Sequence, residues 1–452
     1  MSAARLALWR TRSLRFAMGA GATVISGLTG ILRNKWIAQH LEASGIGILA
    51  QVVSSQNWLG TVGGMSLALP IARSVGSATG SGDWAGARRV VATAAAMLTM
   101  SASIVIALGL FFAPLISRAL LGTPEYAGLI RIGMIGVAGV AFQQLVVGLF
   151  AGRSDLKGPL AYSAVGGLAS VAATLYLVPR AGLGGAVLAV SILFPLGCLG
   201  AIALRWKEHA SLLSGPVDRT GMAGLARGLL TVASSALVAA LAEQGVFLAI
   251  RSHYVRTFGT EANGLLQAGL SISQQVGAIF YAYLSSYAFG KISGLSGVDA
   301  TRAYTRKHWS TLVLLAAAAL IVTSLAAGPL LRILYSHRFD PAQPLMAWAL
   351  VGEFGRIGLL TWALGSLPLG GPRLWLPVAL LFPATLGAAY AVSVASGAGI
   401  LSMPKAYAIS GLAAALVGGM IMSRRGVTLR VRDLAIFLGG AGLLLFLAWV
   451  RA

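Results

Sequence analysis

The stretch Leu32-Arg33-Asn34-Lys35-Trp36-Ile37 has a counterpart 218 residues later, Ile250-Arg251-Ser252-His253-Tyr254-Val255. Other short motifs recur at nearly the same spacing, between 215 and 219 residues. A repeat of about half the chain is typical of transporters built from two similar membrane bundles. The recurring motifs are Glu42-x-x-Gly45 and Glu261-x-x-Gly264, Ser54-x-Gln56 and Ser273-x-Gln275, Arg88-Arg89 and Arg306-Lys307, and Ala113-Pro114-Leu115 and Gly328-Pro329-Leu330.

The composition indicates a membrane protein. Of 452 residues, 57% are hydrophobic and only 10% are charged. A soluble domain carries about 25% charged residues, so most of this chain is expected to lie in lipid. The single cysteine, Cys198, excludes a disulfide within the chain.

The apolar runs predict the architecture, because a helix needs about 20 such residues to cross a bilayer. We expect an all-α polytopic protein of about 12–14 transmembrane helices in two pseudo-symmetric six-helix lobes. The lobes are 1–204 and 225–423, joined by a cytoplasmic linker, 205–224, and followed by an extra membrane segment, 424–452. Whether its apolar part, 434–450, spans the membrane stays open. The predicted spans are 15–38, 45–72, 90–117, 128–151, 158–179, 183–204, 226–250, 264–289, 309–331, 345–368, 374–396 and 402–422.

Charge predicts the orientation. With the N-terminus in the cytoplasm, the inner loops and N-terminus carry about twice as many Lys and Arg as the outer segments, including Arg5, Arg10, Arg12 and Arg15. This bias is the usual cytoplasmic excess of basic residues. It accounts for most of the net charge of +22 without a nucleic-acid partner.

Several function classes are disfavoured by what the sequence lacks. No loop between the predicted spans exceeds about 20 residues, and no Walker A motif is present. No His, Cys and carboxylate cluster has the spacing of a metal site. We therefore expect a transporter rather than an enzyme, with no catalytic residue, metal or cofactor.

Charged residues inside the predicted spans are candidate functional groups, because each costs roughly 2.5–3.5 kcal/mol at the bilayer centre. Glu353 and Arg356 lie three residues apart, on one helical face. They are either cavity groups of a transport cycle or an ion pair that fastens two helices. Glu243 is a candidate coupling group that would take up and release an ion, or else a structural partner of Arg33 or Arg251.

Arg33 and Arg251 occupy equivalent positions in the repeat, near the outer third of their spans. As a pair they are candidates for gripping a phosphate, which guanidinium groups bind bidentately. The alternative is that both side chains snorkel to the outer interface.

Amide side chains also cluster in the spans, and amides bind sugar hydroxyl groups or join helices in lipid. We keep both interpretations for four of them as candidate substrate-binding residues: Gln56, Gln143, Gln274 and Gln275.

The chain resembles the polysaccharide and O-antigen flippases of the multidrug/oligosaccharidyl-lipid/polysaccharide (MOP) exporter superfamily. The resemblance covers nearly the whole chain, to about residue 422, and consists of loose Gly, Pro and aromatic positions. The stretches that carry it are Arg33 to Gly47, Thr260 to Ala268 with Ser271-Ile-Ser273, Pro329 to Tyr335 with Phe339-x-x-Ala342, and Pro114 to Leu121 with Tyr126-Ala127.

The resemblance implies a function. In that family, the substrate is an undecaprenyl-pyrophosphate-linked oligosaccharide that moves from the inner to the outer leaflet of the bacterial plasma membrane. Cavity arginines are thought to attract the pyrophosphate, and Arg33 and Arg251 match them most closely here. The transported oligosaccharide is used in O-antigen, capsule or exopolysaccharide synthesis, with a polymerase and chain-length machinery as further partners. A drug or metabolite antiporter coupled to H+ or Na+ is the alternative, and a membrane polysaccharide polymerase is the third.

Overall fold

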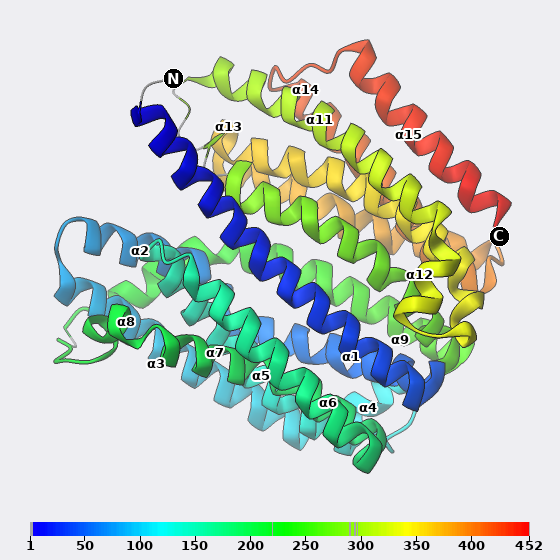
Figure 1. The fold of residues 1–452 in the computed structure, drawn as a ribbon, viewed down its shortest axis with the longest axis horizontal. Helices are drawn as coiled ribbons and strands as arrows, with labels where there is room; N and C mark the ends of the chain where they lie inside the picture. Colours follow the sequence, from blue (N-terminus) through cyan, green and yellow to red (C-terminus); the bar gives the residue numbers. More distant parts are fainter. Residues whose placement is uncertain (1–2, 219, 289–290, 293–294, 296, 452) are drawn as a thin grey trace. The chain divides into compact units, whose positions relative to one another are not determined.

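The computed structural model describes residues 3–451 except 219, 289–290, 293–294 and 296. For residues 3–20, 23, 286 and 287 it describes only the backbone, so the side chains of the N-terminal arginines lie outside the described part. Every regular element in the described ranges is a helix (Figure 1). The predicted all-α class is confirmed.

The helices follow one another with short connections. Short π- and 3-10 segments lie at Leu284–Ala288, His337–Ala342 and Gly399–Leu401. The α-helices are α1 (Ala3–Gly64), α2 (Ala68–Gly80), α3 (Trp84–Phe111), α4 (Ala113–Leu121), α5 (Ala127–Gly152), α6 (Lys157–Ser191), α7 (Leu193–Leu204), α8 (Trp206–Leu213), α9 (Met222–Tyr283), α11 (Val298–Leu325), α12 (Ala327–Leu334), α13 (Gln343–Ala395), α14 (Ser402–Ser423) and α15 (Val431–Val450).

Four long helices are broken by residues with non-helical backbone: Glu42 in α1, Gly182 in α6, Gly259 in α9 and Gly371 in α13. Each break falls between two predicted spans, and the span 183–204 is completed by α7. Eight helices of the described part are long and apolar enough to cross a membrane by length and composition, and α15 is one of them.

The internal repeat seen in the sequence is also present in the backbone conformation. Residues with positive φ recur 215 or 217 positions apart, at the ends or breaks of equivalent helices. Because positive φ is costly for residues other than glycine, such sites mark where the chain must turn. The equivalent pairs are Glu42 and Gly259, Gly82 and Gly297, Ser154 and Gly371, and Gly182 and Gly399.

Contacts divide the chain into two compact units. Unit 1 contains residues 1–40 and 51–244, and unit 2 contains residues 41–50 and 245–452. The lobe boundaries predicted from the sequence, at residues 204 and 225, stay a prediction. Within the predicted linker, residues 206–213 form the short helix α8.

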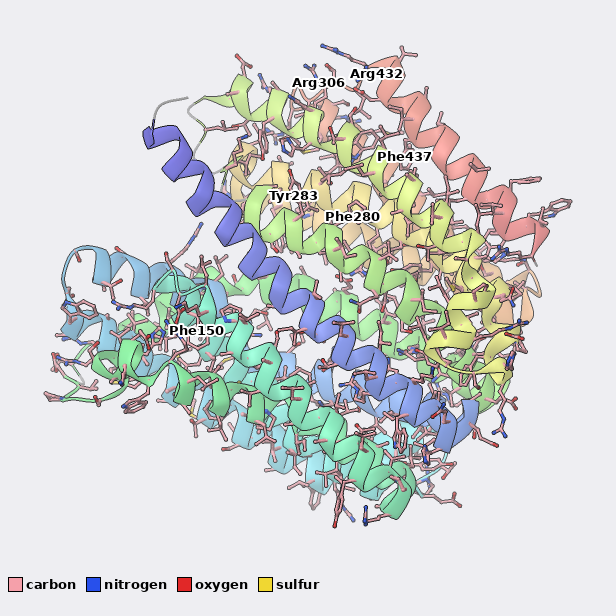
Figure 2. The ribbon with its side chains drawn as sticks, in the orientation of Figure 1. Phe150, Phe280, Tyr283, Arg306, Arg432 and Phe437 are labelled. Atoms are coloured by element: carbon pink, nitrogen blue, oxygen red, sulfur yellow. The ribbon has the colours of Figure 1, made fainter. Side chains whose placement is uncertain are left out.

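In unit 1, a buried apolar cluster joins α2, α3 and α5, with Leu67, Ile71, Leu98 and Leu149 among its members. In Figure 2, Phe150 marks the end of α5 in this unit.

In unit 2, α15 is held by aromatic rings. Phe437 lies within 5.6 Å of Trp309 on α11 and 5.2 Å of Phe354 on α13, measured between ring centroids, and it faces α11 in Figure 2. Trp309 in turn stacks on Trp362 at 4.8 Å. The extra C-terminal segment is therefore a packed helix of this unit.

The start of the second arm of α1 crosses the second arm of α9 inside unit 2, at Gly47 and Gly264. These glycines are 217 residues apart, like Glu42 and Gly259, so the structure pairs Gly264 with Gly47 rather than with the Gly45 of the sequence motif. A Cβ on Gly47 would lie 1.9 Å from the carbonyl oxygen of Thr260, and a Cβ on Gly264 would lie 1.8 Å from that of Ala43. Asn263 Nδ2 also donates to the carbonyl oxygen of Gly47 over 2.7 Å. The contact is reciprocal, as expected of two equivalent segments that meet about a pseudo-two-fold axis.

Candidate functional site: charged and polar groups within the helices

Glu353 is the most enclosed charged group of unit 2. It lies on α13 with no exposed surface, and its carboxylate accepts hydrogen bonds from the hydroxyl groups of Tyr281 on α9 and Tyr407 on α14. A Cβ on Gly277 would overlap the carboxylate at 1.8 Å, so α9 approaches it closely. Charge-assisted hydrogen bonds of this kind offset much of the cost of burying a carboxylate.

Arg356 completes this cluster. Its Nη1 lies 3.9 Å from Glu353 Oε2 and 3.4 Å from the Tyr407 hydroxyl oxygen. Its guanidinium also lies over the rings of Tyr281 and Phe382, 5.4 and 5.2 Å from their centroids. The two charges share a face of α13, as predicted, and side chains of α9 and α14 surround them. A role for either charge in a transport cavity stays a prediction.

Arg251 is nearly buried on α9, 6% exposed. Its Nη2 donates to the side-chain oxygen of Gln267, which lies beyond the break at Gly259. Next to it, Tyr254 donates to the carbonyl oxygen of Ile400 over 2.7 Å. Arg251 therefore joins the two arms of α9.

Arg33 is half-buried in unit 1, and its Nη1 lies 3.4 Å from Ser170 Oγ on α6. Ser170 donates to the carbonyl oxygen of Ala189 on the other arm of α6. In each unit, the repeat-equivalent arginine thus contacts a neutral side-chain oxygen next to a broken helix. Whether either grips phosphate stays a prediction.

Gln56 is fully buried in unit 1 and accepts a hydrogen bond from Ser191 Oγ over 2.8 Å. Its amide packs against Gly136 of α5, where a Cβ would be only 2.1 Å away. These contacts join α1, α5 and α6. Its place in a substrate cavity stays a prediction.

The other predicted amides are less enclosed. Gln143 on α5 and Gln274 on α9 are half-buried, and Gln275 is exposed. Glu243 is half-buried on the first arm of α9 in unit 1, and the neighbouring Gln244 accepts a hydrogen bond from Thr61 over 3.1 Å. Of these groups, Gln275 has the most accessible amide.

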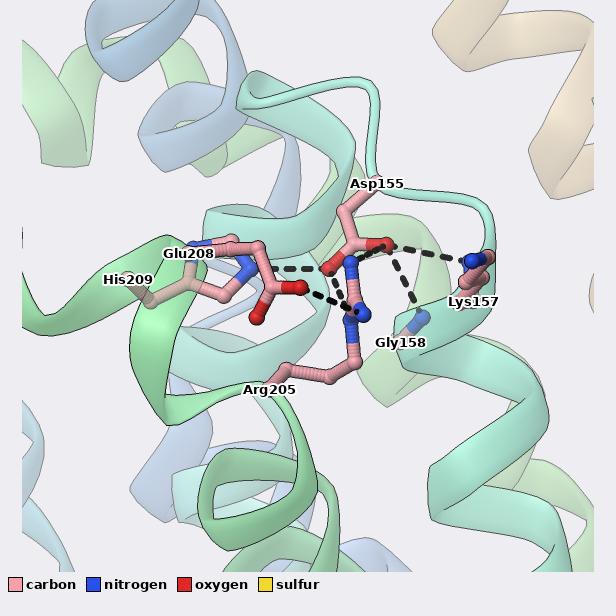
Figure 3. Close-up of polar contacts among 6 residues, drawn as sticks. All are labelled: Asp155, Lys157, Gly158, Arg205, Glu208 and His209. Atoms are coloured by element: carbon pink, nitrogen blue, oxygen red, sulfur yellow. Dashed lines mark hydrogen bonds and ion pairs between the residues drawn. The ribbon is translucent and has the colours of Figure 1, made fainter.

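A cluster around Asp155, in the loop between α5 and α6, was not predicted from the sequence (Figure 3). Asp155 accepts from Arg205 Nε over 3.0 Å and lies 2.8 Å from His209 Nε2. It also accepts from the backbone N–H groups of Lys157 and Gly158, at the start of α6. The side chains of Asp155 and His209 are only 7% and 1% exposed.

The electrostatics of this cluster favour an ionised carboxylate. Burial alone would raise the pKa of Asp155, but hydrogen bonds from Arg205 and His209 outweigh it and lower the pKa. The same hydrogen bond raises the pKa of Arg205. The cluster therefore ties the loop before α6 to the corner between α7 and α8. The spacing of Arg205 and His209, four residues apart on one helical face, was the signal available in the sequence.

Within the described ranges, no three His, Cys, Asp or Glu side chains are grouped so that they could hold a metal ion.

Comparison with known proteins gives relatives for the chain as a whole. No model of a known protein family matches it. The chain is 26% identical over 359 residues to the lipid III flippase of Escherichia coli (strain K12), covering 79% of this chain and 83% of the relative. The lipid III flippase of Shigella flexneri matches to the same extent.

Solved structures share the fold. The lipid II flippase MurJ, in an inward closed conformation, gives a TM-score of 0.68 at 13% identity over 96% of each chain. A multidrug resistance MATE family transporter of the MOP superfamily, in an inward-facing conformation, gives 0.62 at 13% identity over 97% of this chain and 100% of its own. The predicted resemblance to MOP superfamily proteins and the polytopic helical fold are confirmed by these likenesses. The relatives named are flippases and a transporter rather than enzymes, as the sequence predicted for this chain.

Proposed function

We propose that this chain moves an undecaprenyl-pyrophosphate-linked oligosaccharide from the inner to the outer leaflet of the membrane. This is the activity that its resemblance to the lipid-linked flippases of the MOP exporter superfamily implies. The observation that carries this proposal is the 26% identity to a lipid III flippase over 79% of the chain. The oligosaccharide would serve O-antigen, capsule or exopolysaccharide synthesis. The motion would be alternating access, in which two related bundles expose one site to each side in turn.

Three arginines are the proposed attractors of the pyrophosphate: Arg33, Arg251 and Arg356. Each lies on a helix of the apolar framework, where an ionised group is costly unless it serves a partner. Guanidinium groups match phosphate oxygens in pairs. Arg33 already contacts Ser170 and Arg251 already contacts Gln267, so an anion would join these contacts.

The amides are the proposed contacts of the sugar. Gln275 is exposed, and the half-buried Gln143 and Gln274 keep part of their surface for hydroxyl groups. Gln56 would contribute less directly, because its amide is already engaged with Ser191.

Two carboxylates are the proposed coupling groups for H+ or Na+: Glu353 and Glu243. The burial of Glu353 between two tyrosine hydroxyl groups supports this role, because a change of its charge would alter contacts of α9, α13 and α14 together. Glu353→Gln keeps an acceptor oxygen for one tyrosine, places an amide NH2 against the hydroxyl of the other and removes the charge, so it should slow ion-coupled transport. If the Glu353→Gln variant transports as fast as wild type and its rate still responds to the ion gradient, this assignment is contradicted.

The proposed setting is the bacterial inner membrane, with the N-terminus in the cytoplasm and a polysaccharide polymerase and chain-length machinery acting next. The fold shared with a multidrug MATE transporter favours one second candidate, a cation-coupled drug or metabolite antiporter. Its substrate would be a lipophilic cation, which the three proposed arginines would repel.

The experiment that separates the two candidates uses cells that lack this protein. Their lipid-linked saccharides are quantified by mass spectrometry, together with surface polysaccharide. The flippase predicts that undecaprenyl-linked saccharide accumulates and surface glycan is lost. Complementation with wild type should restore both, and complementation with Arg33→Gln/Arg251→Gln should not. Unchanged glycan and no accumulation, with altered drug uptake, would favour the antiporter.

A further inference from the structure

Two segments more than 100 residues apart meet at one end of unit 2: the start of α11 and the link between α14 and α15. Arg302 Nε donates to the carbonyl oxygen of Arg425 over 2.7 Å. About two turns further along α11, Ser310 donates to Asp433 at the start of α15. Figure 2 shows Arg306 and Arg432 close together at this end.

This end of unit 2 carries a concentration of positive charge, which we call the α11/α15 basic surface. Arg306 is half-buried and the other five members are exposed. Within the part of the chain that the structure describes, none of the six forms an ion pair. The members are Arg306, Lys307, Arg424, Arg425, Arg430 and Arg432.

The two acidic residues nearby offset only part of this charge, through the electrostatic interaction of Asp433 with Arg430 and Arg432. Asp299 is paired with Arg302 over 2.9 Å. Asp433 is 3% exposed and accepts from Ser310 and from the backbone N–H of Arg430. Asp433 is therefore used in joining the two segments, Asp299 pairs within α11, and the six positive charges outnumber these two carboxylates.

An apolar stripe continues directly from the basic surface along α15. Val431 is 87% exposed, and Leu434 and Leu438 follow on the same helical face at 40% and 54%. Since α15 is long and apolar enough to cross a membrane, this stripe faces acyl chains. The arginines next to it then lie at the depth of lipid headgroups.

We propose that the α11/α15 basic surface binds the phosphate groups of anionic glycerophospholipids of the bilayer, whose acyl chains lie along the stripe from Val431 to Leu438. Arginine binds phosphate oxygens through paired donors, and basic residues at the membrane surface attract anionic lipids. A soluble acidic partner would match the charge but would leave the apolar stripe unused.

The α11/α15 basic surface has a defined arrangement, which a general excess of cytoplasmic basic residues does not need. That excess orients a chain during insertion and needs no defined arrangement. Here a backbone hydrogen bond and a buried carboxylate hold charges from two distant segments on one surface. A defined lipid site requires such pre-organisation.

The test is native mass spectrometry of the full-length protein in detergent, titrated with phosphatidylglycerol or phosphatidylcholine. Wild type should retain phosphatidylglycerol in clear preference. The variant Arg424→Gln/Arg425→Gln/Arg430→Gln/Arg432→Gln should bind it at least tenfold more weakly. A matched control removes four exposed charges of unit 1: Arg73→Gln/Arg118→Gln/Lys207→Gln/Arg227→Gln.

Two further measurements guard against an effect of misfolding. Replacement of the same four arginines of unit 2 by lysine keeps the charge and should keep most of the binding. Binding to wild type should fall as salt is raised, because exposed charges are screened. The proposal is overturned if wild type shows no preference for phosphatidylglycerol, or if the four-glutamine variant and the unit 1 control lose binding equally.

Discussion

Asp155 is the residue at which several parts of unit 1 are joined. It holds the start of α6, the guanidinium of Arg205 and the imidazole of His209 in one nearly buried cluster. Removal of a partner from such a cluster leaves the remaining polar groups unsatisfied, which costs more than the hydrogen bonds themselves contributed. The cluster is therefore expected to be a sensitive point of the fold.

Asp155→Asn should destabilise the protein by about 2 kcal/mol, because Arg205 and His209 lose a charged acceptor. The measurement is the thermal unfolding midpoint of the purified protein in detergent. Glu208→Gln is the matched control, since Glu208 pairs with Arg205 over 2.8 Å but is 45% exposed. An exposed pair contributes about 0–1 kcal/mol. Equal midpoints for Asp155→Asn and wild type would contradict this role.

The lowered pKa of Asp155 predicts a pH dependence. A carboxyl whose pKa is lower in the folded state stabilises that state above its unfolded pKa, about 3.9, and the stabilisation is lost as pH falls through the folded pKa. The difference in unfolding midpoint between wild type and Asp155→Asn should thus be constant from about pH 5 to 7 and shrink below about pH 4. A difference that persists undiminished at pH 3 would be inconsistent with this shift.

Glu42 has a backbone conformation that favours glycine, with φ 57° and ψ −172°. Strain of this kind costs about 1–3 kcal/mol. The side chain compensates little, since its ion pair with Arg338 over 2.6 Å is two-thirds exposed on both sides. Glu42→Gly should therefore raise the unfolding midpoint relative to Glu42→Ala, which loses the pair but keeps the strain. If the alanine variant is at least as stable, the backbone at this site is not strained.

At the scale of elements, the breaks in the long helices and their crossings define the framework. The second arms of α1 and α9 approach so closely that the backbone of each occupies the space of a Cβ on the other. No side chain other than hydrogen fits at Gly47 or Gly264 without movement of one arm.

Gly264→Ala should destabilise unit 2 by about 1–3 kcal/mol, the usual cost of overpacking. Gly47→Ala should have a similar effect, because the two contacts are reciprocal. Gly439→Ala on α15 is the control, since nothing lies within 4 Å of its added Cβ and alanine is the better helix former. The measurement is again the unfolding midpoint. A loss for Gly439→Ala as large as that for Gly264→Ala would show that the crossing is not tightly packed.

The sequence predicted the positions of the helices better than the contacts between them. Apolar length located the helical arms, and the breaks at Glu42, Gly182, Gly259 and Gly371 fall between predicted spans. The reciprocal crossing was not predicted, because glycine is frequent throughout the chain, with 58 copies. Only the three-dimensional path shows which of them meet another backbone.

At the scale of the whole molecule, the repeat and the composition predicted a polytopic helical fold, and the structural likenesses confirm it. The polar groups were harder to predict, because their partners come from distant helices. The pairing of Glu353 with Arg356 follows from their spacing. The two tyrosines that donate to Glu353 are 72 and 54 residues away from it in the chain. Asp155 was missed because its partners lie about 50 residues further along, in a segment expected to be a linker.

The central claim is that this chain moves a lipid-linked oligosaccharide across the bilayer. The most direct measurement is translocation in proteoliposomes that contain the purified protein and a fluorescent polyprenyl-pyrophosphate saccharide, with dithionite added outside to bleach the exposed label. The account predicts that the protein makes the inner-leaflet label accessible to dithionite, and that labelled phosphatidylglycerol stays protected. Protection of the saccharide lipid equal to that in protein-free liposomes, or equal movement of both lipids, would contradict it.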